Sequence, residues 1–283
     1  MDILKHPTEI QSRVRERRYL RQSVGVVPTM GALHDGHLSL VKTARAECDF
    51  VITTIFVNPL QFGPNEDLDQ YPRTLQTDLD MCRAAGADLA FIPTADDMYC
   101  AGSSTTVTVA GLSGILEGAC RQTHFDGVTT VVAKLLNITL PDRAYFGQKD
   151  YQQQLIIRRM VQDLNWPLSI VTCPIVREPD GLAMSSRNQY LRPHERERAL
   201  LLNRILDHAA RQAADGGSSP DQVQSDMAGQ LFGAEGVKPD YAVVVDPDSL
   251  EPAGDHVSTA VALLAAWVGR TRLLDNRILT FAG

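Results

Sequence analysis

The stretch VGVVPTMGALHDGHLSLVKTARAE, residues 24–47, decides the fold, because it joins an apolar run to an amphipathic run through a turn. Residues 24–27 are typical of a buried strand, and residues 36–47 carry apolar side chains at helical spacing. A helix N-terminus presents unpaired backbone N–H groups and the positive end of its dipole, and both favour an anion. The sequence therefore predicts a phosphate site at a strand-to-helix turn.

Two histidines, His34 and His37, lie in this turn. Their spacing makes them neighbours if the turn is already helical, and each imidazole can donate to phosphate oxygens or become cationic as charge builds. Gly31 and Gly36 let the backbone approach a ligand closely. The H-x-G-H pattern matches the signature of nucleotidylyl transferases and class I aminoacyl-tRNA synthetases. Two ordinary loop histidines are the alternative, and the rest of the chain decides between them.

Strand patterns and helix patterns continue to alternate after this turn. The expected strands are residues 51–57, 88–93, 105–109, 143–147 and 169–173, and the expected helices are residues 74–85, 127–137 and 150–164. Strands separated by helices of this length predict βαβ crossovers. The fold class is therefore α/β, with a Rossmann-like doubly wound parallel sheet that binds ligands at the carboxyl ends of its strands.

The pattern changes near residue 176. The expected elements there are a charged helix over residues 194–214, a second helix over 221–232, and strands over 241–245, 261–267 and 271–275. The GGSSP break at residues 216–220 is typical of a loop between helices. These features predict a Rossmann-like domain over residues 1–175 and a smaller C-terminal α+β lid domain over residues 176–283.

Composition narrows the function classes. The chain has 283 residues, 44% of them hydrophobic, and a formal net charge of -7, which argues against nonspecific nucleic-acid binding. The basic residues of 13–21 are interpreted as the solvated face of a first helix, with an RNA-binding arm as the alternative.

The cysteines and the apolar runs indicate the compartment. Five cysteines, an odd number without a C-x-x-C pair, predict reduced and mostly buried thiols. The longest apolar stretch, residues 257–268, is too short and too interrupted to cross a bilayer, and the N-terminus lacks an apolar targeting segment. We therefore expect a soluble, cytoplasmic protein with no nucleic-acid or membrane partner.

Other phosphate-binding fingerprints are absent from the sequence. A Walker A loop needs a glycine directly before its lysine, and the nearest candidate, residues 127–134, lacks it. The glycine-rich residues 111–118 contain no G-x-G. These segments therefore contain neither a P-loop motif nor the glycine-rich fingerprint of dinucleotide-binding domains.

Two further clusters supply groups that an adenylate-forming site needs. FGQKDYQQ, residues 146–153, places Lys149 and Asp150 where a strand gives way to a helix, and MSSRN, residues 184–188, places hydroxyls and a guanidinium on a loop. Attack on an α-phosphate spreads negative charge over phosphate oxygens, which such donors stabilise. A surface charge pair and a serine N-cap are the alternatives.

Together these blocks resemble the pantoate–β-alanine ligase family. The similar blocks, in that family's order, are PTMGALHDGH, FVNPLQFGPNEDLDQYPRT, HFDGVTTVVAKLLN, FGQKDYQQ, MSSRN and TRLLDN. The resemblance implies ATP-dependent ligation of pantoate to β-alanine through a pantoyl-adenylate, with release of pyrophosphate and AMP. It also implies a requirement for Mg²⁺ and a homodimer.

The resemblance assigns roles to individual residues. The implied catalytic and phosphate-binding groups are His34, His37, Lys149, Ser185, Ser186 and Arg187. The other implied ATP contacts are Pro28, Met30, Gly147, Asp150, Val176 and Met184. The implied pantoate contacts are Met30, Asn58, Gln61, Phe62 and Gln153. Asp78 corresponds to a position near the metal, although an acidic residue in a first helical turn is common without any function.

Some of these residues have plainer interpretations. Core packing is the alternative for Met30 and Phe62, and capping a turn is the alternative for Asn58. The sequence also departs from the family where Arg121 to His124 stand, because the family has Pro and Gly between the arginine and the histidine. Losing them removes a fixed φ and a residue that tolerates positive φ.

Three competing functions remain to be weighed. A mononucleotide adenylyltransferase shares H-x-G-H, but paired glutamines and FGQKD suit a small polar carboxylate better. An aminoacyl-tRNA synthetase needs an anticodon-binding domain for which the chain has no room. A regulatory nucleotide-binding module that has lost catalysis usually loses its charge-handling residues first, whereas this sequence has Lys149 together with both histidines. An acyl-adenylate must be shielded from water, so we expect the lid and the loop at residues 65–71 to close during turnover.

Overall fold

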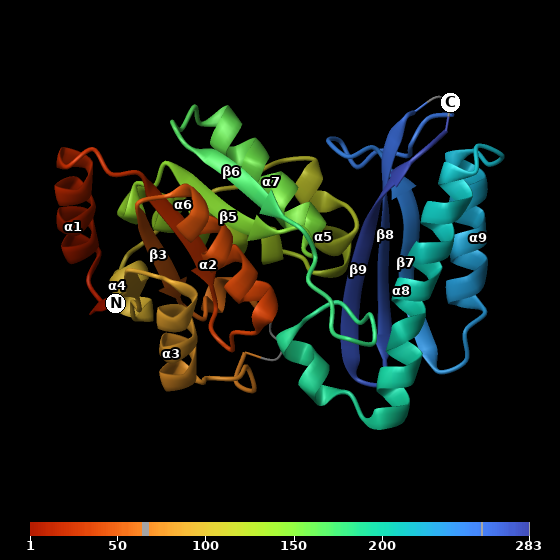
Figure 1. Ribbon diagram of the computed structural model, residues 1–283, viewed down its shortest axis with the longest axis horizontal. Coiled ribbons are helices and arrows are strands. Elements are labelled where there is room, and N and C mark those ends of the chain that lie inside the picture. The colour runs from red at the N-terminus through yellow and green to blue at the C-terminus, as the bar shows by residue number, and fades with distance from the viewer. Residues whose placement is uncertain (64–67, 256, 283) are drawn as a thin grey trace. The chain divides into compact units, whose positions relative to one another are not determined.

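The chain folds into two compact units, which the computed structural model describes over residues 1–63, 68–255 and 257–282 (Figure 1). One unit comprises Met1–Gln148 and Gln152–Pro174, and the other comprises Lys149–Tyr151 and Ile175–Gly283. Of the loop expected to close, residues 65–67 lie outside the described residues. None of the helices in the described ranges combines the length and apolar character that a membrane span requires.

The first unit is built on a six-stranded sheet in which every neighbouring pair is parallel. In sheet order the strands are β1 (Asp2–Leu4), β4 (Leu89–Phe91), β3 (Phe50–Ile55), β2 (Val24–Thr29), β5 (Arg143–Gly147) and β6 (Ser169–Cys173). The order reverses at β2, since β3 lies on one side of it and β5 on the other. Such a reversal marks the ligand-binding edge of an open α/β sheet.

Helices cover both faces of this sheet. They are α1 (Pro7–Tyr19), α2 (Asp35–Glu47), α3 (Leu75–Ala85), α4 (Ala95–Met98), α5 (Glu117–Cys120), α6 (His124–Thr139) and α7 (Tyr151–Asp163), with short 3-10 turns η1 (Pro59–Gln61) and η2 (Leu112–Gly114). Along β2, Val26 packs in one apolar core with Val128 and Ile156, whereas the next residue, Val27, packs in a second core with Val41. This alternation confirms the doubly wound, Rossmann-like fold.

The second unit combines two long helices with an antiparallel sheet. Its elements are the 3-10 turn η3 (Ser186–Tyr190), α8 (Pro193–Ala214), α9 (Pro220–Phe232), β7 (Val237–Val245), β8 (Thr259–Val268) and β9 (Thr271–Thr280), with strand order β7-β8-β9. The helices lie along the same sheet in Figure 1, and Ile205, Val223 and Leu264 share one apolar core. The α+β character predicted for the C-terminal part is therefore confirmed.

One predicted strand is wrong. Residues 105–109 form no strand. The backbone N–H of Val107 donates to Thr130 Oγ1 at 3.0 Å, and the Val107 carbonyl accepts from Thr129 Oγ1. Because two threonine side chains of α6 satisfy this backbone, the segment needs no neighbouring strand.

Two smaller features complete the comparison with the sequence. The first helix begins at Pro7, well before the basic residues that mark it in the sequence, with the proline at a position where its missing N–H is harmless. All five cysteines are free; Cys48, Cys82 and Cys173 are buried, while Cys100 and Cys120 are exposed. The prediction of mostly buried, unpaired thiols is confirmed.

Gly127 allows α6 to approach η1 closely. A Cβ at Gly127 would stand 2.2 Å from the carbonyl oxygen of Leu60, which is backbone and cannot move aside cheaply. We expect Gly127→Ala to lower the free energy of unfolding by about 1–3 kcal/mol, as overpacking does. In the helical control Gly229→Ala, where nothing lies within 4 Å, the same change should raise it by about 0.5–1 kcal/mol. Urea unfolding followed by circular dichroism measures both; equal stability of the two variants would contradict this prediction.

Candidate active site

The turn that follows β2 has a left-handed backbone. Gly31 has φ +83° and Ala32 has φ +50°, so the chain bends sharply before α2 begins at Asp35. A non-glycine residue at positive φ is held there only by its surroundings.

Asp78, on α3, holds this turn. Its Oδ2 accepts from the backbone N–H of Ala32 at 3.0 Å, and its Oδ1 accepts from that of Leu33 at 2.9 Å and from Thr74 Oγ1 at 3.1 Å. The side chain is buried. Both carboxylate oxygens are thus engaged in shaping the turn, whereas the proximity of Asp78 to a metal stays a prediction.

The two histidines stand at the start of α2. His34 is the N-cap, and its Nδ1 accepts from Gly36 N at 3.2 Å, while His37 Nδ1 accepts from His34 N at 3.3 Å. The ring centroids are 4.1 Å apart. Because each Nδ1 accepts from the backbone, the neutral rings carry their proton on Nε2, which makes each Nε2 a hydrogen-bond donor. The turn therefore orients two donors beside the positive end of a helix.

Two amide side chains form a buried cluster after β3. Asn58 Nδ2 donates to Gln61 Oε1 at 3.1 Å and to the Gly127 carbonyl at 3.0 Å, and Asn58 Oδ1 accepts from Leu60 N at 3.3 Å and from Tyr99 Oη at 2.8 Å. These four bonds saturate the Asn58 amide. The contacts of Asn58 therefore orient Gln61. Asn58 also caps the turn η1, as its alternative interpretation predicts.

Gln61 connects this cluster to the turn after β2. Its Nε2 lies 2.9 Å from Met30 Sδ, so the structure brings together two of the residues predicted to bind pantoate. Burial raises the pKa of Tyr99 to about 12, which keeps its hydroxyl protonated as a donor to Asn58. Tyr99 is not among the residues predicted for the site. Its partner, Asn58, lies 41 residues earlier in the chain, and nothing in the sequence around Tyr99 indicates that contact.

The atypical loop at residues 121–124 also contacts Gln61. His124 Nδ1 lies 2.7 Å from the Gln61 carbonyl oxygen, Arg121 Nη2 donates to the same oxygen at 3.4 Å, and Arg121 Nη1 is 2.9 Å from His124 Nε2. Thr123 takes φ +67°. The loop thus has a left-handed backbone at a β-branched residue.

The remaining predicted residues of the first unit lie in β2, at the end of β5, directly after η1 and on α7. Pro28 is in β2, whose pairing with β3 runs on to Thr29 while its pairing with β5 ends at Val26. Gly147 ends β5. The ring of Phe62 packs edge-on against Tyr71 with centroids 5.8 Å apart. Gln153 is half-buried on α7.

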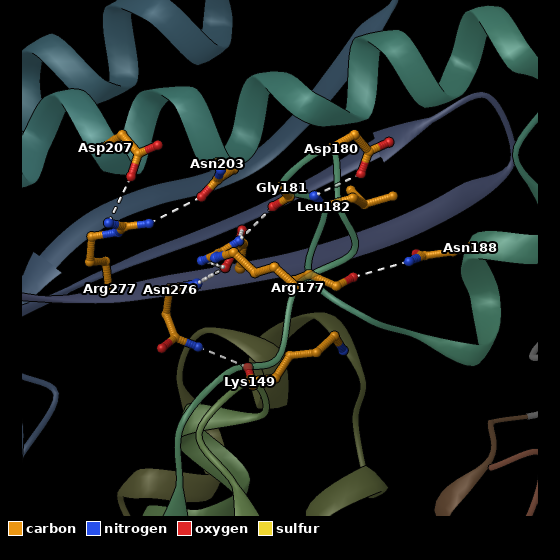
Figure 2. Close-up of polar contacts among 12 residues, drawn as sticks. Lys149, Arg177, Asp180, Gly181, Leu182, Asn188, Asn203, Asp207, Asn276 and Arg277 are labelled. Atoms are coloured by element: carbon orange, nitrogen blue, oxygen red, sulfur yellow. Dashed lines mark hydrogen bonds and ion pairs between the residues drawn. The ribbon is translucent and has the colours of Figure 1, made fainter. Parts of the chain in front are cut away.

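The second unit carries the other predicted donors. The predicted domain boundaries put Lys149 in the first domain, whereas the structure groups it with the second unit. Its Nζ is 3.7 Å from Asp150 Oδ1, and its backbone carbonyl accepts from Asn276 Nδ2 at 2.9 Å (Figure 2).

The segment from Val176 to Arg187 is a short hairpin that leads into a 3-10 turn. Arg177 bridges to Ala183, and Met184 N donates to the Val176 carbonyl at 3.0 Å, which brings together two of the residues predicted to contact ATP. Ser185 is the N-cap of η3, and its Oγ accepts from Arg187 N at 3.3 Å. Ser186 and Arg187 follow, both half-buried. The N-cap interpretation of Ser185 is therefore confirmed.

A family model for pantoate-beta-alanine ligase matches residues 2–278 of this chain. The chain belongs to the pantoate–β-alanine ligase family. It is 48% identical over 279 residues to the pantothenate synthetase of Moorella thermoacetica, with 99% of each chain covered.

Solved structures agree with this assignment. The pantothenate synthetase of Thermus thermophilus aligns with a TM-score of 0.92 and 45% identity, over 98% of this chain and 99% of that one. The pantoate-beta-alanine ligase of Francisella tularensis, solved with Beta-gamma ATP and beta-alanine, aligns with a TM-score of 0.79 and 36% identity, over 98% and 97% of the two chains. The resemblance carried by the sequence blocks is thus confirmed over nearly the whole chain. Membership of this ligase family also sets aside the adenylyltransferase, synthetase and regulatory alternatives.

The carboxylate of Asp78 gives a test of the turn. We expect Asp78→Asn to lower the free energy of unfolding by about 1–3 kcal/mol, because the new NH₂ group would face a backbone N–H that has lost its acceptor. Asp80→Asn on the same helix is the matched control, since Asp80 is exposed and pairs with Arg83 at the surface; its effect should stay within about 0.5 kcal/mol. Urea unfolding measures both, and similar losses in the two variants would refute the anchoring role.

Thr123 gives a test of the atypical loop. Thr123→Gly should raise the free energy of unfolding by about 1 kcal/mol, because glycine takes φ +67° without the clash of a β-branched side chain. Thr123→Ala, which keeps a Cβ, should gain less. Thermal unfolding under identical conditions ranks the three proteins. Stability that falls in Thr123→Gly would show that the threonine side chain contributes more than its backbone strain removes.

Proposed function

We propose that the chain joins pantoate to β-alanine in a reaction driven by ATP, through a pantoyl-adenylate, with release of pyrophosphate and AMP. The observation that carries this proposal is the match to the pantoate–β-alanine ligase family over residues 2–278. The Francisella tularensis relative was solved with Beta-gamma ATP and beta-alanine, which supports the same substrates here. The donors of both units are of the types that adenylate formation requires.

The first step is attack by a pantoate carboxylate oxygen on the α-phosphorus of ATP. A new P–O bond forms as the bond to pyrophosphate breaks, and negative charge spreads over the phosphate oxygens. In this proposal the Nε2–H groups of His34 and His37 donate to the phosphates, and the N-terminus of α2 adds its dipole. Lys149 spans the phosphate and the reacting carboxylate.

The second unit supplies the remaining phosphate contacts. Ser185, Ser186 and Arg187 close over the triphosphate. A single well-placed donor is worth about 3 kcal/mol of barrier in comparable sites. The proposal therefore assigns catalysis to alignment and charge stabilisation.

The second step is attack by the β-alanine amine on the acyl carbon of the adenylate. A C–N bond forms, the C–O bond to the phosphate breaks, AMP leaves, and the nitrogen loses a proton. Neither step needs a covalent bond to the enzyme. The adenylate must be protected from water, so the proposal includes closure of the C-terminal lid.

Pantoate and adenosine are assigned to different residues. Gln61 and Gln153 bind the hydroxyls and carboxylate of pantoate, because an amide donates and accepts at once. Met30 and Phe62 contact its methyl groups, and Asn58 supports Gln61. The adenosine and ribose contacts are Pro28, Gly147, Asp150, Val176 and Met184.

The proposal also includes the requirement for Mg²⁺ that the family resemblance implies. Among the described residues, no group of three or more His, Cys, Asp or Glu side chains could hold a metal ion, and both oxygens of Asp78 already accept hydrogen bonds. These residues do not form a metal site by themselves, so no step is assigned to Mg²⁺. A homodimer and a cytoplasmic location also remain part of the proposal.

An assay of products tests the proposed reaction. With ATP and pantoate alone, the protein should catalyse pantoate-dependent exchange of pyrophosphate into ATP, and AMP should accumulate over many turnovers only when β-alanine is added. Lys149→Ala should lower the exchange rate by about 100-fold or more, which corresponds to about 3 kcal/mol. The exposed Lys42→Ala on α2 is the matched control and should stay within about twofold.

Three outcomes would contradict the proposal. Exchange that proceeds without pantoate would point to another acceptor. Formation of ADP in place of AMP would exclude an adenylate. A rate near that of the wild type in Lys149→Ala would remove Lys149 from the mechanism, provided that the melting temperatures of the two proteins agree.

A further inference from the structure

On the last strand, β9, Asn276 is buried on a side whose other residues are half-buried or exposed. Thr271, Leu273, Asp275 and Leu279 are buried at alternate positions, as expected for the side of the strand that faces the core of this unit. On the other side, Leu274 is half-buried and Ile278 is exposed, but Asn276 is only 2% exposed. A buried polar side chain at such a position needs a specific partner.

The partner of Asn276 is the backbone of Lys149. Asn276 Nδ2 donates to the Lys149 carbonyl at 2.9 Å, across 127 residues of sequence, and Figure 2 shows the amide pointing from β9 to that carbonyl. Tyr151, two residues on, donates from its hydroxyl to the Pro247 carbonyl at 3.1 Å. These bonds explain why Lys149–Tyr151 belong to the second unit, although the chain on both sides belongs to the first.

The neighbouring residue, Asp275, holds the hairpin that leads to Ser185, Ser186 and Arg187. Its carboxylate accepts two bonds from the Arg177 guanidinium, at 2.7 and 2.9 Å, and is 4% exposed. Arg177 also donates to the Gly181 carbonyl at 3.1 Å, so it stabilises the hairpin from within. Bidentate pairs of this kind fix orientation as well as distance.

We infer that Asn276 is a positioning residue for Lys149, and that Asp275 and Asn276 together set the Lys149 backbone and the hairpin that leads to Ser185 relative to each other. This inference rests on the proposed function of Lys149. Two consecutive side chains of one strand point to opposite faces, so a single rigid element can reach both segments. The ammonium, hydroxyl and guanidinium groups then share one scaffold, which keeps their separation constant.

Replacing the amide tests this role. Asn276→Ala removes the donor to the Lys149 carbonyl, and we expect kcat for pantoate-dependent pyrophosphate exchange to fall about tenfold while KM for ATP changes by less than about threefold. Gln224→Ala is the matched control: Gln224 Oε1 accepts from the backbone of Val244 at 2.8 Å in the same unit, with no bond to Lys149. Its kcat should match the wild type after correction for the folded fraction.

A second variant separates positioning from simple stability. Asn276→Asp keeps the shape of the side chain, and its neutral carboxylic acid can donate to the Lys149 carbonyl whereas its carboxylate cannot. An ordinary aspartate is ionised at neutral pH, so kcat per folded molecule should fall about tenfold, as in Asn276→Ala. A purely structural role predicts a kcat per folded molecule equal to that of the wild type.

The outcomes of these experiments are distinguishable. If the wild type shows no pantoate-dependent exchange, the proposed function fails. If the wild type is active, and Asn276→Ala keeps its kcat or loses no more than Gln224→Ala, the positioning role is refuted. An Asn276→Asp variant that keeps the kcat of the wild type per folded molecule refutes it as well, even where Asn276→Ala folds poorly.

Discussion

A buried carboxylate that accepts two successive main-chain N–H groups is the interaction on which the first half of the candidate active site depends. Asp78 accepts from Ala32 and Leu33, and Ala32 holds a positive φ that its own side chain disfavours. The direction in which the chain enters α2 follows from that bend. The capping of α2 by His34, and the backbone bonds that set both histidine tautomers, depend in turn on where α2 begins.

The same principle, a polar side chain saturated by its neighbours, organises the cluster after β3. Asn58 uses all four of its hydrogen-bonding positions inside the protein, so it has no capacity left for a ligand unless a partner moves. In the proposed function Asn58 therefore acts through Gln61, whose backbone carbonyl is contacted separately by the loop at residues 121–124. Preorganisation of this kind keeps an amide in one orientation before a ligand arrives.

The sequence predicts the sheet well and its supporting contacts poorly, for a physical reason. Long apolar runs such as residues 51–57 are decided by burial alone, and they fold as expected. Residues 105–109 also have a strand-like sequence, yet threonine side chains of α6 satisfy the backbone of Val107, and no local pattern distinguishes the two cases. The donors of the candidate site are predicted from the sequence blocks that resemble the family. Tyr99 and Asn276, in contrast, act through contacts that only the folded chain creates. A signal for Asn276 does exist, since it ends the TRLLDN block.

The membership of Lys149 in the second unit bears on how charge is organised. Contacts within the second unit hold the Lys149 backbone and the hairpin before Ser185. Donors fixed in advance need not reorganise as charge develops, and this makes them more effective than mobile donors of the same type. The histidine pair is fixed just as firmly, but by the first unit. Within each unit, hydrogen bonds of that unit therefore hold the segments that carry the candidate donors.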